Sequence, residues 1–187
     1  AETAQKKGIE LTGKMTDHLH KLDPYRPVTC GINIFFNFLS SMGMGVYSDD
    51  KAEKSAQSAK REAEKKEKKK PVGSEFYNTL ACLVGDYFMK IGATLPPCDW
   101  KTKDAFANMD IAGYNYGLFR YKNDLKKYPQ RLILGTETFC KDAYSFWEIA
   151  KKNKRILGDF VWSGWEYIGE TGDGAADYED YKGEMPH

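Results

Sequence analysis

Residues 131–138 read RLILGTET, a short apolar run that leads into a carboxylate flanked by two threonines. An apolar stretch of this length, bounded by polar residues, is typical of a buried β-strand. We therefore expect a strand over 131–135, with Thr136, Glu137 and Thr138 directly after its end. A charge in that place is either an ordinary surface glutamate or a functional group, and Glu137 is the first candidate for chemistry.

Outward from this stretch, strands and helices are predicted to alternate. Apolar, β-rich runs predict further strands, and helical spacing of apolar residues predicts helices. The two prolines at 96–97 predict a loop, and Asp110 and Asp159, which flank strands, are interpreted as caps or ion-pair partners. The expected strands are 27–32, 109–116 and 156–162, the expected helices are 3–22, 76–91, 120–128 and 143–152, and the expected loop is 93–104.

Apolar strands that alternate with helices indicate an α/β fold with a parallel, helix-covered sheet, either an open sheet or a barrel. An open nucleotide-binding sheet usually has a glycine-rich phosphate loop, and Gly43-Met44-Gly45 lacks the third glycine. In a barrel, chemistry sits where strands end. Three expected strands end in Asn115-Tyr116, in Glu137 and in Trp162, which favours half of an eight-stranded (β/α)8 TIM barrel.

Composition excludes several function classes. The net charge is +1, which favours neither a nucleic-acid nor a membrane partner. Four widely spaced cysteines without a CxxC pair predict reduced thiols and no metal site. Residues 51–70 hold nine Lys/Arg and four Glu within a Lys/Glu/Ala-rich stretch at about 48–72. That stretch is interpreted as a solvated insertion, with a basic partner-binding arm as the alternative.

Two aromatic residues join Glu137 as candidates. Trp162 ends the last expected strand and could border a binding cleft, or it could be a core tryptophan. Tyr116 could orient a neighbouring carboxylate, or it could be a core tyrosine. Aromatic side chains make up 14% of the chain, which suits a core and also suits a sugar cleft, because flat rings stack on pyranoses.

Four segments together resemble consecutive blocks of the catalytic barrel of glycoside hydrolase family 2. They are LDPYRPVTCGIN (22–33), DIAGYNYG (110–117), RLILGTETF (131–139) and GDFVWSGWEYIGE (158–170). Their order and spacing are similar to strands five to eight of that barrel. The resemblance implies that residues 1–187 form the C-terminal half of the catalytic TIM barrel, with the Lys-rich stretch as an insertion.

The resemblance also implies a retaining β-glycosidase, β-galactosidase first, with β-glucuronidase or another family 2 activity as alternatives. Glu137 matches the nucleophile and Tyr116 the tyrosine that contacts it. Trp162 matches the aromatic residue beside the sugar subsite, and Asn115 is placed to reach sugar hydroxyls. A carbohydrate substrate, no cofactor, and a bacterial protein of the cytoplasm or periplasm are expected.

One departure from the family pattern concerns the acid/base residue. The family carries it in an Asn-Glu pair ahead of the first helix, and no Asn-Glu dipeptide occurs in these 187 residues. We therefore expect a fragment of a longer polypeptide, inactive when isolated. A non-catalytic sugar-binding or interaction fragment is the alternative. Half a barrel also exposes two strand edges, which predicts association, for instance into a homo-oligomer.

Overall fold

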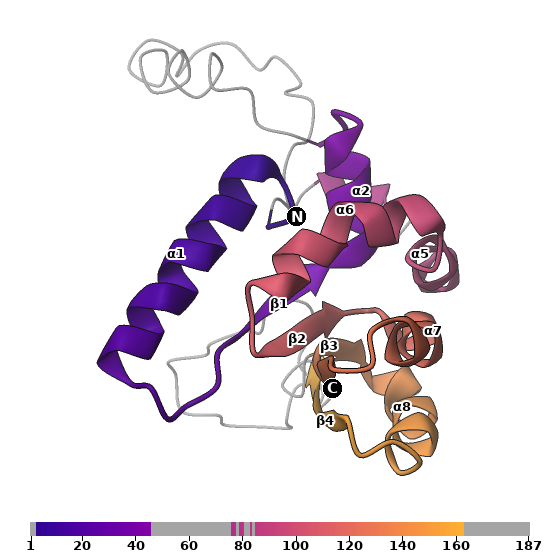
Figure 1. Cartoon of the computed structure of the whole chain (residues 1–187). Coiled ribbons are helices and arrows are strands. Elements are labelled where there is room, and N and C mark those ends of the chain that lie inside the picture. The colour runs from indigo at the N-terminus through magenta and orange to yellow at the C-terminus, as the bar shows by residue number, and fades with distance from the viewer. Residues whose placement is uncertain (1–2, 46–75, 78, 81–82, 84, 163–187) are drawn as a thin grey trace, which may run out of the picture.

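The computed structural model describes residues 3–45, 76–77, 79–80, 83 and 85–162. Their strands form one parallel sheet in the order β1-β2-β3-β4, so the chain adds each strand beside the last (Figure 1). The predicted α/β class and parallel sheet are confirmed. The stretch at 48–72 lies outside the described residues. The strands are β1 (Thr29–Asn33), β2 (Ile111–Asn115), β3 (Leu132–Phe139) and β4 (Ile156–Trp162).

Helices connect these strands, as the alternating pattern predicted. Two short 3-10 turns, η1 (Leu118–Arg120) and η2 (Cys140–Asp142), precede the last two helices. The expected helices at 3–22, 120–128 and 143–152 are confirmed within a few residues at each end. The helices are α1 (Lys6–Leu22), α2 (Ile34–Ser41), α5 (Asp86–Gly92), α6 (Pro96–Ala107), α7 (Tyr121–Lys127) and α8 (Ala143–Ala150).

The predicted loop at 93–104 is wrong, because most of it belongs to α6. Pro96 and Pro97 occupy the first positions of this helix. Backbone N–H groups there have no partner inside the helix, so proline costs nothing and its fixed φ suits the helix start. A second helix, α2, forms from the apolar residues after β1. The side chain of Asn33 caps it by accepting a hydrogen bond from the amide of Phe36 at 3.3 Å.

One face of the sheet packs against helices. The ring of Tyr114 on β2 stacks on Phe106 of α6 at 4.5 Å and meets the edge of Tyr121 of α7 at 5.3 Å. Tyr121 in turn meets Phe146 of α8 at 5.9 Å. Ile133 on β3 is fully buried in the same core. We call this side the helix-covered face, and successive strand residues must alternate between it and the opposite face.

A buried ion network ties these helices together. Arg120, which is 2% exposed, pairs with Asp99 of α6 at 2.5 Å and with Asp124 of α7 at 2.9 Å. Asp124 also accepts hydrogen bonds from Tyr114 at 2.5 Å and from Arg131 at 3.1 Å. Every charge in the network has an opposite partner within bonding distance. Such pairing is what makes burial of charged groups tolerable.

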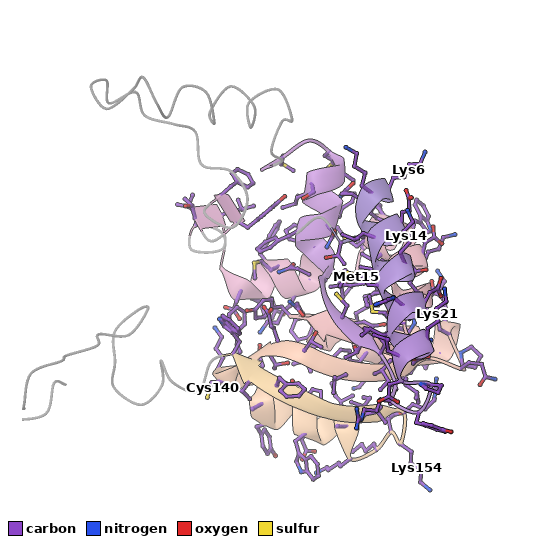
Figure 2. The ribbon with its side chains drawn as sticks, turned by 90° about the vertical axis from the view of Figure 1, so that its left-hand side faces the viewer. Lys6, Lys14, Met15, Lys21, Cys140 and Lys154 are labelled. Carbon is purple, nitrogen blue, oxygen red and sulfur yellow. The ribbon has the colours of Figure 1, made fainter. Side chains whose placement is uncertain are left out.

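Helix α1 has two unlike sides. Lys6, Lys14 and Lys21 extend along one side, and Met15 lies on the other (Figure 2). The apolar stripe on that other side stays open to solvent. Its members and their exposed fractions are Leu11 58%, Met15 54%, Leu19 44% and Leu22 70%.

Candidate functional site

Strand β3 runs four residues beyond its predicted end at Gly135, and it places Glu137 inside the strand instead of after it. Gly135 lies opposite Tyr114 on β2, and Glu137 lies opposite Asn115, the next residue of β2. One extra residue, Thr136, therefore stands on β3 at this point. Such a β-bulge changes which way the following side chains point, and bulges occur next to active sites for that reason.

The bulge decides the direction of Glu137. A Cβ atom on Gly135 would lie 3.2 Å from Oγ1 of Thr138, so positions 135 and 138 share one face although a regular strand would separate them. Thr138 is 3% exposed and interacts with Tyr121 of α7, which places it on the helix-covered face. Its neighbour Glu137 therefore points to the opposite face, which we call the site face.

Asn115 lies on the site face beside Glu137. Its Oδ1 accepts a 2.6 Å hydrogen bond from Oγ1 of Thr136, the bulge residue. A Cβ atom on Gly31 of β1 would overlap that same Oδ1, so the glycine leaves the amide its space. This bond orients the amide of Asn115 and leaves its Nδ2 group as the donor available to a ligand.

Tyr116 joins the ends of β2 and β3. Its amide donates a 2.8 Å hydrogen bond to the carbonyl oxygen of Glu137. Its φ is 55°, in the left-handed region that a non-glycine residue adopts at a cost of about 1–3 kcal/mol. Its ring stacks on Phe139 at 4.4 Å. Strained residues of this kind cluster at functional sites, because the surrounding contacts hold them in place.

Trp162 lies at the end of β4, where its Cα atom faces that of Phe139 on β3. Its side chain is 53% exposed. Tyr116, Phe139 and Trp162 thus follow one another across three neighbouring strands. Sequence reasoning missed Phe139, although an aromatic residue two positions after Glu137 in TETF was a usable signal.

The carboxylates near this point differ in their surroundings. The side chain of Glu137 forms no hydrogen bond or ion pair with another described residue. Burial raises the pKa of Asp159 on β4, although Thr138 and the amide of Phe160 hydrogen-bond with it. The interpretation of Asp159 as a cap or ion-pair partner is wrong. That of Asp110 is confirmed, because it pairs with His20 at 2.7 Å.

Other kinds of site find no support in the part of the chain that the structure describes. There, no three His, Cys, Asp or Glu side chains gather as metal ligands. No helix in these same ranges has the length and apolar character needed to cross a bilayer. Cys30, Cys98 and Cys140 form no disulfide bond among the described residues, and burial raises the pKa of Cys98 to about 11.

Neither a protein-family profile nor a curated protein matches this sequence. Among solved structures, the chain is similar to two of glycosyl hydrolase family 2 members from Bacteroides cellulosilyticus, one of them from strain DSM 14838. The TM-scores are 0.48 and 0.46, with 21% sequence identity in both cases. Each similarity covers 86% of this chain but only 13% and 12% of those chains. The chain therefore spans a small part of either neighbour's length.

Proposed function

We propose that this chain carries the nucleophile of a retaining β-glycoside hydrolase, with Glu137 as that nucleophile and a β-galactoside as the substrate. The observation that carries the proposal is the position of Glu137. It lies toward the C-terminal end of a parallel strand, beside Asn115 on the site face, and is unpaired among the described residues. A carboxylate that is not engaged by a cation keeps its lone pairs for attack on an anomeric carbon.

In the proposed reaction, an oxygen of Glu137 forms a bond to the anomeric carbon while the bond to the leaving oxygen breaks. A second carboxylic acid protonates that oxygen, and the same group later deprotonates the water that releases the sugar. Two such displacements retain the anomeric configuration. No Asn-Glu dipeptide is present to supply the acid, so we propose that it comes from outside these 187 residues, from a strand that would extend the sheet beyond β1 toward a (β/α)8 barrel.

The other candidate residues serve binding and orientation in this proposal. Nδ2 of Asn115 donates to a sugar hydroxyl, because its Oδ1 is already engaged by Thr136. Tyr116 orients the carboxylate of Glu137, to whose backbone it is hydrogen-bonded. Trp162, half-exposed at the end of β4, supplies an apolar ring surface for the sugar.

A mechanism-based label tests the nucleophile directly. A 2-deoxy-2-fluoro-β-galactoside with a dinitrophenolate leaving group needs no acid catalyst to depart, so the 187-residue chain itself can be used. Tandem mass spectrometry should find the sugar on Glu137. Glu137→Gln should abolish labelling, and Glu148→Gln, which changes a glutamate on α8 that pairs with Lys151 and Lys152, should label like the wild type.

The possible outcomes separate the competing functions. A label on Glu166 or Glu170 would overturn the choice of nucleophile. Preference for the corresponding glucuronide would shift the substrate to a β-glucuronide. Saturable sugar binding without any label would favour a non-catalytic sugar-binding fragment and contradict the enzymatic proposal.

A further inference from the structure

Asp159 occupies a place that a side chain on Gly135 would fill. Gly135 and Asp159 face each other across β3 and β4, and a Cβ atom on Gly135 would overlap Oδ1 of the aspartate. The carboxylate therefore lies directly over the backbone of β3, one residue before the bulge. This oxygen is buried and has no hydrogen-bond partner among the described residues. Water cannot stabilise a carboxylate in such a position, so its stabilisation depends on neighbouring protein groups.

Thr138 is the neighbour that reaches this carboxylate from β3. A Cβ atom on Gly135 would lie 2.3 Å from Oδ1 of Asp159 and 3.2 Å from Oγ1 of Thr138, so these two side chains share one place on the helix-covered face. Tyr121 from α7 interacts electrostatically with both residues. The hydroxyl of Tyr121 is fully buried and, within the described ranges, has no hydrogen bond of ordinary geometry. Three polar groups from β3, β4 and α7 thus meet on the helix-covered face, directly behind Glu137.

The spacing on β3 explains what this meeting does. Residues 135 and 138 both face Asp159, so the two residues between them must form the bulge, and Glu137 must turn to the site face. Without the bulge, regular alternation would place residue 137 on the same face as residue 135 and would direct Glu137 into the helix layer. The positions of Gly135, Thr138 and Asp159 on the helix-covered face therefore determine that the carboxylate of Glu137 points to the site face.

We propose that Asp159 and Thr138 are positioning residues, which hold the β3 bulge so that Glu137 and Asn115 share one face. The significance for catalysis rests on the proposed function of Glu137. The positioning itself does not, because it concerns only the shape of β3. In this arrangement Asp159 touches no substrate and acts through its contacts with Gly135 and Thr138 on β3.

Hydrogen exchange can measure the bulge without any activity assay. The amide of Tyr116 donates to the carbonyl of Glu137, so its protection reports on the bulge. The amide of Ile133 donates to the carbonyl of Arg155 at 2.8 Å, on the same strand before the bulge, and serves as the internal control. Thr138→Val, which replaces the hydroxyl by a methyl group, should lower protection at Tyr116 by about tenfold relative to Ile133, because the buried carboxylate of Asp159 then loses its polar neighbour on β3.

Conservative variants distinguish positioning from general packing. Thr138→Ser keeps the hydroxyl, and Asp159→Asn keeps an acceptor oxygen of the same shape, so both should keep the Tyr116 to Ile133 ratio within about twofold of wild type. Asp159→Ala should reproduce the effect of Thr138→Val. Equal losses of protection at the two amides, or an unchanged ratio in both disruptive variants, would overturn the proposal.

Labelling by the 2-fluoro-galactoside links this inference to the chemistry. In the disruptive variants the labelling rate at Glu137 should fall together with the protection ratio, and Thr138→Ser should restore both. If the wild-type chain takes no label, the proposed function fails, but the exchange ratios still decide whether Asp159 and Thr138 hold the bulge. A labelling rate that stays at the wild-type value while the ratio falls would overturn the link between the bulge and Glu137.

Discussion

Asn115 and Glu137 lie opposite each other on β2 and β3, and the pair before them in the register is Tyr114 and Gly135, so β3 advances by two residues where β2 advances by one. This arrangement is possible only because Thr136 is an extra residue on β3. The hydroxyl of Thr136 donates a 2.6 Å hydrogen bond to Oδ1 of Asn115. The residue that interrupts the regular ladder is thus the one that links the two candidate site residues.

Gly135→Ala should destabilise the protein, because the new methyl group would displace the carboxylate of Asp159. Overpacking of this kind costs about 1–3 kcal/mol. Gly158→Ala is the matched control on the neighbouring strand, since its Cβ atom would meet only Leu134 at an ordinary 3.6 Å. Urea unfolding of both variants checks the difference, and equal losses in the two would contradict the close approach of Asp159 to Gly135.

Arg120→Met should be far more damaging than loss of a surface arginine. It would leave Asp99 and Asp124 buried without their shared cation, which typically costs about 3–5 kcal/mol. Arg26→Met is the control, because Arg26 pairs with Asp23 through a side chain that is 87% exposed. Exposed pairs contribute about 1 kcal/mol or less. Similar midpoints of chemical denaturation in the two variants would refute the importance of burial here.

The raised pKa of Asp159 has a defined effect on stability against pH. The folded state binds this proton more tightly than the unfolded state, so the free energy of unfolding should fall as pH rises from the group's usual pKa, about 4, through its raised value. Asp159→Asn has no charge to bury and should lose this slope. Unfolding experiments at several pH values on both proteins check it. A wild-type stability that rises over this window relative to Asp159→Asn would show the opposite shift.

We expect the isolated chain to form dimers or larger assemblies with further copies of itself. The apolar stripe of α1 is open to solvent, and β1 and β4 are the edges of the described sheet. Edge strands of this kind favour pairing with another chain. Met15→Glu should weaken the association seen by sedimentation velocity. Lys21→Glu, on the lysine side of the same helix, should weaken it less. A monomer at high concentration would contradict this expectation.

The elements of the fold follow largely from local patterns. The apolar run ILGDFVW predicts β4 with its correct bounds, Ile156–Trp162, because polar residues precede it and the strand is short. The loop expected at Pro96 and Pro97 was wrong for a local reason as well. Proline ends regular structure in many contexts, but its fixed φ and missing donor suit the first turn of a helix, which is where Pro96 and Pro97 lie.

The details of the candidate site depend on contacts that no local pattern contains. Glu137, Asn115, Tyr116 and Trp162 can be singled out from their places at strand ends. The bulge at Thr136 cannot, because its existence depends on the registers of β2 and β4 against β3. The surroundings of Asp159 cannot be predicted for the same reason, since its neighbours Gly135 and Thr138 are more than twenty positions away in the sequence.

The pairing of Arg120 with one carboxylate from α6 and another from α7 has a consequence for how the protein unfolds. If α6 alone leaves the sheet, Arg120 stays buried without Asp99. If α7 alone leaves, Arg120 moves with it and Asp99 stays behind without this cation. The intermediate with one helix detached is therefore expensive. We expect α6 and α7 to unfold as a single cooperative unit, although more than ten residues of chain separate Asp99 from Arg120.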